Sequence, residues 1–214
     1  MMAEIILAIL RGLPSTIALT ALALVMGTIL GMPLMLARRS PFFLLRVISG
    51  GLITFVRSIP PIVWLFVIFF GIGNDYVRIS PFVAAVIGLG LIASAYMAEI
   101  YRGALLSIHP GQVEGAAALG IARFRIWIDV IVPQLLRVAL PGMATYAIGL
   151  LKDSAIASTI GVGELTFYAN QQSMATYRGM EVFTFVAAIY ILLSLPIAWA
   201  SRRIDKKMRA KVSR

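Results

Sequence analysis

Charged side chains inside apolar stretches are the residues of this sequence that could do chemistry on a small solute. Arg57 lies in one apolar stretch, and Lys152 and Asp153 interrupt another. A charge at the centre of a helix in lipid costs about 2.5–3.5 kcal/mol, so such residues usually mark a functional site. Asp153 could hold an amino group, and Lys152 or Arg57 a carboxylate. The hydroxyl groups of Ser58 and Ser154 could donate hydrogen bonds in the same cavity, which would then suit a zwitterion.

A structural role is the alternative for the same charges. Lys152, Asp153 and Arg57 could pair with one another or with Glu99 and so fix a helix bundle, or they could reach the membrane surface. Glu99 and Arg102 lie three residues apart on one face of a helix, where opposite charges pair. The sequence favours a structural role for Glu99, Arg102 and Arg57, and it leaves both roles open for Lys152 and Asp153.

The composition places these residues in a membrane. Of the 214 residues, 60% are hydrophobic and 13% are charged, whereas about a quarter of a soluble domain is charged. A membrane-spanning helix needs about 20 apolar residues, so the chain has room for about five such helices. The chain has no cysteine and a single histidine, His109, which excludes disulfides and argues against a metal site. We expect one transmembrane domain over residues 1–214.

Apolar runs predict an all-α integral membrane protein with five spans. The runs cover residues 13–37, 51–73, 81–101, 135–162 and 182–200, and residues 164–181 form a more polar connection. Pro60 and Pro61 remove backbone donors from the second run, which is tolerated in lipid only beside a cavity or a neighbouring helix. We therefore assign Pro60 a structural role.

The basic residues predict which helix ends face the cytoplasm. The net charge is +10, and all but four of the 19 basic residues fall on one side if the first loop, the third loop and the C-terminal tail share that side. The four exceptions are Arg11, Arg78, Lys152 and Arg178. Lys and Arg accumulate in cytoplasmic loops, so we expect the N-terminus outside and the C-terminus inside. The segment 107–133 and the basic tail 202–214 would then be cytoplasmic.

A polar segment at residues 112–133 separates two of the apolar runs, and we expect it to form a binding surface for another protein. Ala116 and Ala117 give a slim helix, and Glu114 near its start is favoured by the helix dipole. Gly120 permits a turn after that helix. A plain polar connector is the alternative reading of this segment.

The polar segment resembles the signature loop of ABC importer permeases, in which Glu-Ala-Ala is followed by three residues, Gly, nine residues and Ile-x-Leu-Pro. The positions that fall in register are Glu114, Ala116, Gly120 and Pro133. Gly115 replaces the first alanine, and Val130 and Val132 replace the Ile and the Leu. The resemblance implies docking of an ATPase subunit on a set of loop residues, namely Glu114, Gly115, Ala116, Ala117, Gly120, Arg123 and Pro133.

Three further segments extend the resemblance over most of the chain. Residues 55–60 look like the Phe-Arg-Gly-Thr-Pro box of polar amino-acid permeases, residues 95–103 look like the end of their third span, and residues 151–154 look like their Lys-Asp-Thr/Ser box. The chain is therefore similar to permeases of the histidine, glutamine, glutamate and opine import family. The resemblance implies the fold of a type I ABC importer permease, with five transmembrane helices and a cytoplasmic coupling helix.

The same resemblance implies a function and a set of partners. The chain would be a permease subunit in the bacterial inner membrane, importing an amino acid or similar small polar zwitterion by alternating access. The implied partners are a second permease subunit in a homodimer or heterodimer, two ATP-binding cassette subunits and an extracytoplasmic solute-binding protein. The chain has no Gly-x-x-x-x-Gly-Lys-Ser/Thr loop, so we expect no enzyme activity and no bound cofactor, with ATP-Mg on the partner ATPase.

Two other classes of function are weighed against this one. The sequence argues against an intramembrane enzyme, because it has no Gly-x-Ser-x-Gly or His-Glu-x-x-His motif and no cysteine. A secondary transporter or channel that works alone is the remaining alternative. It lacks the support of an inverted repeat, and it would leave the cytoplasmic helix without a purpose. Transport without an ATPase partner would favour it.

Overall fold

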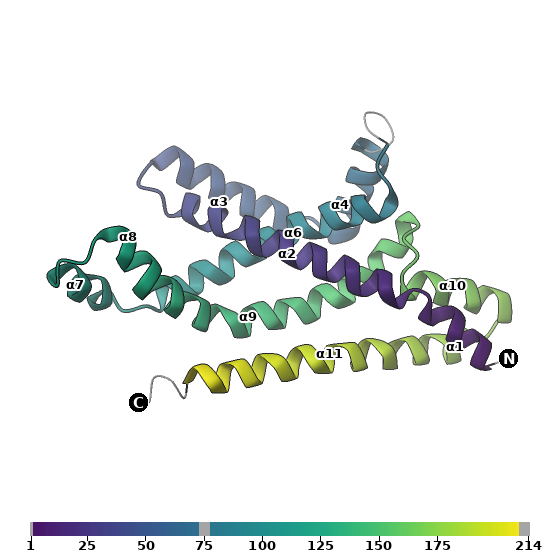
Figure 1. The fold of residues 1–214 in the computed structure, drawn as a ribbon. Coiled ribbons are helices and arrows are strands. Elements are labelled where there is room, and N and C mark those ends of the chain that lie inside the picture. Colours follow the sequence, from purple (N-terminus) through teal and green to yellow (C-terminus); the bar gives the residue numbers. More distant parts are fainter. Residues whose placement is uncertain (1, 73–77, 210–214) are drawn as a thin grey trace.

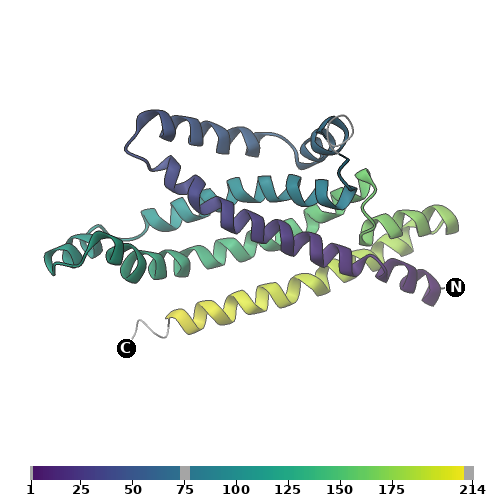
Figure 2. The same cartoon turned by 45° about the horizontal axis from the view of Figure 1, so that its top comes forward.

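The fold is an elongated bundle of helices, described by a computed structural model over residues 2–72 and 78–209 (Figure 1). Long helices run between two ends of the molecule. One end holds the N-terminus and α10 (Leu165–Thr176). The other holds α7 (Gly111–Ala118), α8 (Arg123–Arg125) and the last turns of α11 (Gly179–Arg209), and Figure 2 shows the same separation after a turn of the molecule.

The chain begins with two helices, α1 (Met2–Leu10) and α2 (Leu13–Arg38). The predicted span 13–37 matches α2 to within one residue, whereas α1 is a helix that the sequence did not predict. The two helices part at Gly12, where an added Cβ atom would lie 2.3 Å from the carbonyl carbon of Glu164. Only glycine permits so close an approach of two backbones.

The second predicted span is broken, so the prediction of one span over 51–73 is wrong in its start and in its shape. Helix α3 (Phe43–Ser58) begins earlier, and α4 (Pro61–Phe66) with its π-helical extension η1 (Val67–Ile72) leaves it at an angle of 100°. A residue before proline avoids helical geometry, and Ile59 is accordingly extended, with φ −98° and ψ 130°. The last residue of the predicted span, Gly73, lies outside the described residues.

Helix α6 (Pro81–Leu106) is the centre of the bundle and continues past the predicted end at residue 101. It packs on α2 through small residues. A Cβ atom at Gly27 would lie 2.4 Å from the Cβ of Ala93, and one at Gly31 would lie 2.6 Å from the Cβ of Met97. Small residues let helices approach closely in lipid, where van der Waals contact rather than the hydrophobic effect holds them together.

The segment after α6 forms α7, α8 and a helical run composed of η2 (Ile126–Ile131), α9 (Val132–Asp153) and η3 (Ser154–Ile160). The fourth span was predicted to begin near residue 135, but the helix begins earlier and passes through Pro133. Proline removes a backbone donor and crowds the preceding turn. That turn is the wider π-helical η2, which gives the proline ring room.

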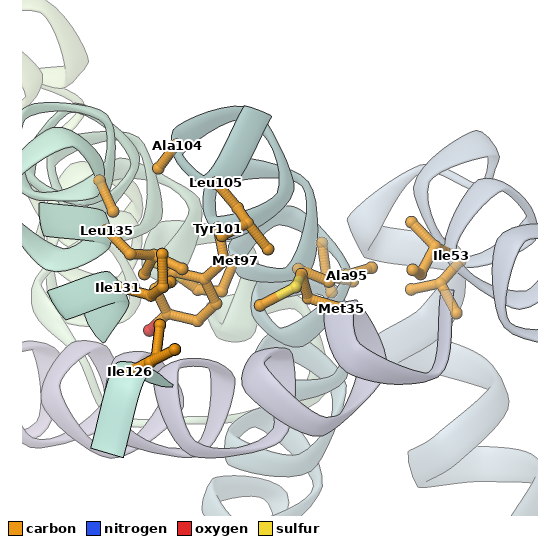
Figure 3. Close-up of a cluster of buried hydrophobic side chains, with 14 of the residues drawn as sticks. Met35, Ile53, Ala95, Met97, Tyr101, Ala104, Leu105, Ile126, Ile131 and Leu135 are labelled. Carbon is orange, nitrogen blue, oxygen red and sulfur yellow. The ribbon is translucent and has the colours of Figure 1, made fainter. Parts of the chain in front are cut away.

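A buried cluster joins α2, α3, α6 and α9 and also includes residues of α7 and η2 (Figure 3). It contains Met97 and Tyr101 of α6, Met35 of α2, Ile53 of α3 and Leu135 of α9. The hydroxyl of Tyr101 also donates to a backbone carbonyl of α2, at 3.3 Å. The cluster fixes the helices whose ends carry the polar segment.

The last two helices differ from the prediction. Residues 164–181 were expected to be a polar connection, but most of them form α10. Helix α11 (Gly179–Arg209) has 31 residues and exceeds the predicted span 182–200 at both ends. It includes most of the predicted tail 202–214, of which residues 210–214 lie outside the described part.

Four helical runs of the described chain are long and apolar enough to cross a membrane, and the bent pair of α3 and α4 makes a fifth if it counts as one span. The prediction of an all-α membrane protein with five spans is therefore confirmed, with its second span broken.

Candidate functional site

A cavity lies where the bend between α3 and α4 meets α6 and α9. It has a volume of about 510 Å³. Its walls combine two opposite charges, two tyrosines, two hydroxyl groups and the prolines of the bend, and the lining residues are Arg57, Ser58, Ile59, Pro60, Pro61, Ile92, Tyr96, Thr145, Tyr146, Gly149 and Asp153. The broken span therefore forms one wall of the cavity, which is where backbone carbonyls freed by proline are tolerated in lipid.

The positive side of the cavity is Arg57, held over an aromatic pair. Its guanidinium carbon lies 4.7 Å from the centroid of the Tyr96 ring, within the range of a cation–π interaction. Tyr96 in turn stacks on Tyr146, with ring centroids 5.0 Å apart and an angle of 24° between the planes. The two rings fix the orientation of Arg57 without neutralising its charge.

The negative side of the cavity is Asp153, which is half-buried at the end of α9. Within the described part of the chain, neither Asp153 nor Arg57 forms an ion pair. A carboxylate and a guanidinium therefore line one cavity and leave each other unpaired. Such an arrangement can hold a molecule that carries both signs of charge.

Two of the predicted solute-binding residues are not brought to this cavity. Lys152 is exposed and absent from the lining, although it precedes Asp153 in the chain. Ser154 is fully buried, and its hydroxyl donates to the carbonyl of Leu151 at 2.7 Å. Ser58 does line the cavity, and its hydroxyl donates to the carbonyl of Thr54 at 2.8 Å, which leaves its oxygen free to accept.

Tyr96 and Tyr146 are site residues that sequence reasoning missed. Tyrosine is expected at membrane surfaces, where its hydroxyl reaches water. Tyr96 instead stands well inside the 26-residue helix α6, and Tyr146 well inside α9. A tyrosine far from both ends of an apolar run was the available signal.

Glu99 forms an ion-pair cluster with two arginines. Its carboxylate accepts from Arg102 Nη2 at 2.9 Å, which confirms the predicted pair. Arg38, at the end of α2, pairs with the other oxygen of the same carboxylate, and this partner was not predicted. The cluster ties α2 to α6, so the structural role expected for Glu99 and Arg102 agrees with the geometry.

The polar segment contains a well-defined helix–turn unit. Gly120 has a φ of +74°, a left-handed conformation that favours glycine. The Gly120 amide donates to the Ala117 carbonyl at 3.0 Å, and the Ile121 amide donates to the Ala116 carbonyl at 3.2 Å. This pair of bonds is the Schellman motif, which ends α7. The turn expected at Gly120 is therefore confirmed.

The outer face of this unit is uncovered. Glu114, in the first turn of α7, is exposed, as are Gly115, Ala117 and Arg123, whereas Ala116 is buried against the helix behind it. Two large apolar side chains are also uncovered, since Leu119 is 81% exposed and Phe124 is 73% exposed. Exposed apolar side chains rimmed by polar ones are typical of a protein interface.

A buried carboxylate stands at the opposite end of the molecule. Glu164 is 0% exposed and caps α10: one oxygen accepts from the Phe167 amide at 2.7 Å and the other accepts from the Tyr190 hydroxyl at 2.9 Å. Burial raises the pKa of Glu164, and these hydrogen bonds oppose that rise only in part. The sequence had placed Glu164 in a polar connection, and an N-capping acid before a helix was the missed signal.

Comparison with known proteins identifies the chain at the level of a family. The family described as the binding-protein-dependent transport system inner membrane component matches residues 23–210. A glutamine transport system permease protein, GlnP of Escherichia coli (strain K12), is 32% identical over 204 residues, covering 94% of this chain and 93% of that protein. An octopine transport system permease protein, OccM of Rhizobium radiobacter, is 32% identical over 226 residues, covering 97% of this chain and 92% of that protein.

Solved structures agree with these matches. A chain in the crystal structure of an amino acid ABC transporter with histidines matches with a TM-score of 0.88 and 32% identity, over 96% of each chain. An inward-facing methionine ABC transporter matches with a TM-score of 0.80 at 24% identity, over 96% of this chain and 98% of that one, which supports the fold alone. The chain therefore belongs to the family of binding-protein-dependent transport system inner membrane components.

Proposed function

We propose that this protein is the permease subunit of an ATP-driven importer for an amino acid or a similar small polar zwitterion. The observation that carries the proposal is the cavity in which Arg57 and Asp153 remain unpaired. Relatives named for glutamine and octopine transport support the same class of solute.

The two charged side chains of the cavity suit the two charges of a zwitterion. Asp153 binds the ammonium group, and Arg57 binds the carboxylate through its guanidinium, which can offer two parallel donors. Ser58 accepts a hydrogen bond from the solute. The stacked rings of Tyr96 and Tyr146 hold Arg57 in place and form an aromatic wall for the solute's side chain.

Energy for import comes through α7 and the turn at Gly120. One of two ATP-binding cassette subunits, each holding ATP-Mg, docks on this unit, where Glu114, Leu119 and Phe124 are exposed, and the other docks on a second permease subunit. The second permease subunit, either a copy or a similar chain, completes the membrane part. The end with α10 and the N-terminus lies outside, and a solute-binding protein delivers the solute there. Closure of the ATPase pair moves the coupling helices and opens the cavity outward, and hydrolysis reverses the change.

The cavity is tested by two neighbouring substitutions. We expect Asp153→Asn to lower uptake by at least about tenfold, equal to about 1.4 kcal/mol, because it removes the partner of the ammonium group. Uptake of a radiolabelled amino-acid panel that includes glutamine and octopine is measured in proteoliposomes holding the complete transporter. The matched control is Lys152→Gln, next in sequence but exposed and outside the cavity, which should keep uptake within about twofold.

Three outcomes would contradict parts of the proposal. Normal uptake in Asp153→Asn, or an equal loss in both variants, would remove the cavity as the solute site. Uptake that continues after the ATPase subunits are removed would favour a transporter that works alone.

A further inference from the structure

A second hollow follows α3 away from the solute cavity. It has a volume of about 700 Å³ and runs along one side of α3 toward the end where α2 stops and α3 begins. Its lining residues are Arg38, Arg46, Val47, Gly50, Gly51, Thr54, Phe55 and Ser58. We call this hollow the α3 groove. Ser58 lines both the α3 groove and the solute cavity, so the two hollows adjoin at that residue.

The floor of the α3 groove is one valine followed by a row of small and hydroxyl-bearing residues. Val47, Gly51, Thr54 and Ser58 lie four, three and four residues apart and therefore share one face of the helix. A Cβ atom at Gly51 would meet nothing within 4 Å, so the floor is open there. A larger side chain at this position would narrow the groove.

The two hydroxyl groups of the floor have their protons engaged. Thr54 Oγ1 donates to the carbonyl of Gly50 at 3.0 Å, and Ser58 Oγ donates to the carbonyl of Thr54 at 2.8 Å. Each hydroxyl oxygen keeps lone pairs that can accept a hydrogen bond. The floor thus presents acceptors, one helical turn apart, to a donor that moves along it.

The far end of the α3 groove is positively charged. Arg46 is exposed, lies 5.8 Å from the centroid of the Phe43 ring, and has no carboxylate partner within the described residues. Arg38 stands beside it and is fixed by its pair with Glu99. Because Arg102 shares that carboxylate, the cluster keeps a net positive charge, which attracts a carboxylate.

We propose that the α3 groove is the route along which the solute leaves the cavity for the basic end of the molecule. Thr54 and Ser58 accept hydrogen bonds from its ammonium group, and Arg46 attracts its carboxylate. This inference rests on the proposed function, since it needs a transported zwitterion.

A helix of a second permease subunit is the competing occupant of the α3 groove. In a symmetric homodimer that buried this groove the same surface would meet itself, and the groove lining of the other copy offers Arg46 no carboxylate. An arginine buried in such a contact without a carboxylate partner costs free energy. The charge at the end of the groove favours an anionic group of the solute.

Single cysteines test the route, because the chain has no cysteine of its own. Thr54→Cys and Gly51→Cys are placed in the complete transporter and treated with sulfonatoethyl methanethiosulfonate, a charged reagent that attacks thiolates in water. The matched control is Leu52→Cys, on the same turn of α3 but outside the groove. We expect the two groove positions to react at least about tenfold faster than the control, because a thiol among apolar groups rarely ionises. Modification at Thr54→Cys should block uptake, and modification at Leu52→Cys should not.

The route and the import function can fail separately. Equal, slow modification at all three positions in transporters that import normally would overturn the route and leave the function standing. Oxidation that joins two permease subunits through Thr54→Cys, with no reaction toward the reagent, would make the groove an interface between copies and would also overturn the route. Loss of uptake in Asp153→Asn tests the function without reference to the groove.

Discussion

Glu99→Gln should destabilise the bundle because one carboxylate serves two arginines. The side chain of Glu99 is 17% exposed, and those of Arg38 and Arg102 are 29% and 34% exposed. Removing one partner of a fully buried pair costs about 3–5 kcal/mol, whereas exposed pairs contribute about 0.2–1 kcal/mol. The cluster lies between these limits, so we expect a loss of about 2 kcal/mol in the free energy of unfolding.

The two arginines should differ in their effects. The free energy of unfolding is measured by titrating mixed micelles with dodecyl sulfate, which separates helices but leaves much of each helix intact. Arg102 and Glu99 lie on the same helix, so their pair can persist in the unfolded state. Arg38 reaches Glu99 from α2, so its pair is lost. Arg38→Gln should therefore cost more than Arg102→Gln.

A second ion pair of the same spacing provides the control. Arg178 and Glu181 also lie three residues apart, at 3.4 Å, but their side chains are 43% and 49% exposed. Glu181→Gln should change the free energy of unfolding by less than about 1 kcal/mol. The reasoning from burial would be refuted if Glu99→Gln and Glu181→Gln cost the same, or if Arg102→Gln cost more than Arg38→Gln.

Two further predictions concern the ends of the molecule. Glu114→Lys should lower both uptake and the amount of ATPase that copurifies by at least about tenfold. The control is Glu181→Lys, which changes an exposed acid in the first turn of a helix at the opposite end and should leave ATPase binding unchanged. An intact complex in Glu114→Lys would contradict the docking hypothesis. Burial raises the pKa of Glu164 above its ordinary value of 4.5, so its carboxylate binds a proton more readily in the folded protein than in the unfolded one. Thermal stability should therefore rise as the pH falls through the raised pKa toward 4.5. Glu164→Gln keeps an acceptor for the Phe167 amide and should remove this part of the pH dependence, and an unchanged pH profile would contradict the assignment.

The limits of the helices were predictable where charged residues mark them. The apolar run of α2 ends at Arg38 and Arg39, and the structure agrees to within one residue. The break at Pro60 was missed, because the apolar run continues across Ile59 and hydropathy does not reveal a change in the direction of the helix axis. Helix α10 was missed for the opposite reason: it mixes polar and apolar residues, and its stability comes from a buried cap and from contact with α1.

The solute cavity was predictable in its charges and not in its walls. Arg57 and Asp153 stand out as charges in apolar runs, and the structure brings both to one cavity. Lys152 carries the same signal but points elsewhere, since neighbouring residues on a helix face different directions. Tyr96 and Tyr146 were not recognised as site residues, because tyrosine is counted as hydrophobic and does not stand out in an apolar run.

The close contact of α2 with α6 limits how the protein can move. Backbones that touch through Gly27 and Gly31, with Arg38 and Glu99 paired across the same seam, leave no room for sliding. Helices α2 and α6 should therefore move together as one rigid unit. Arg57 and Ser58 lie beyond it, on a helix that ends at the extended residue Ile59. A rotation at Ile59 would move α3 relative to the rigid unit of α2 and α6. Such a rotation would change the size of the cavity without breaking any contact between α2 and α6.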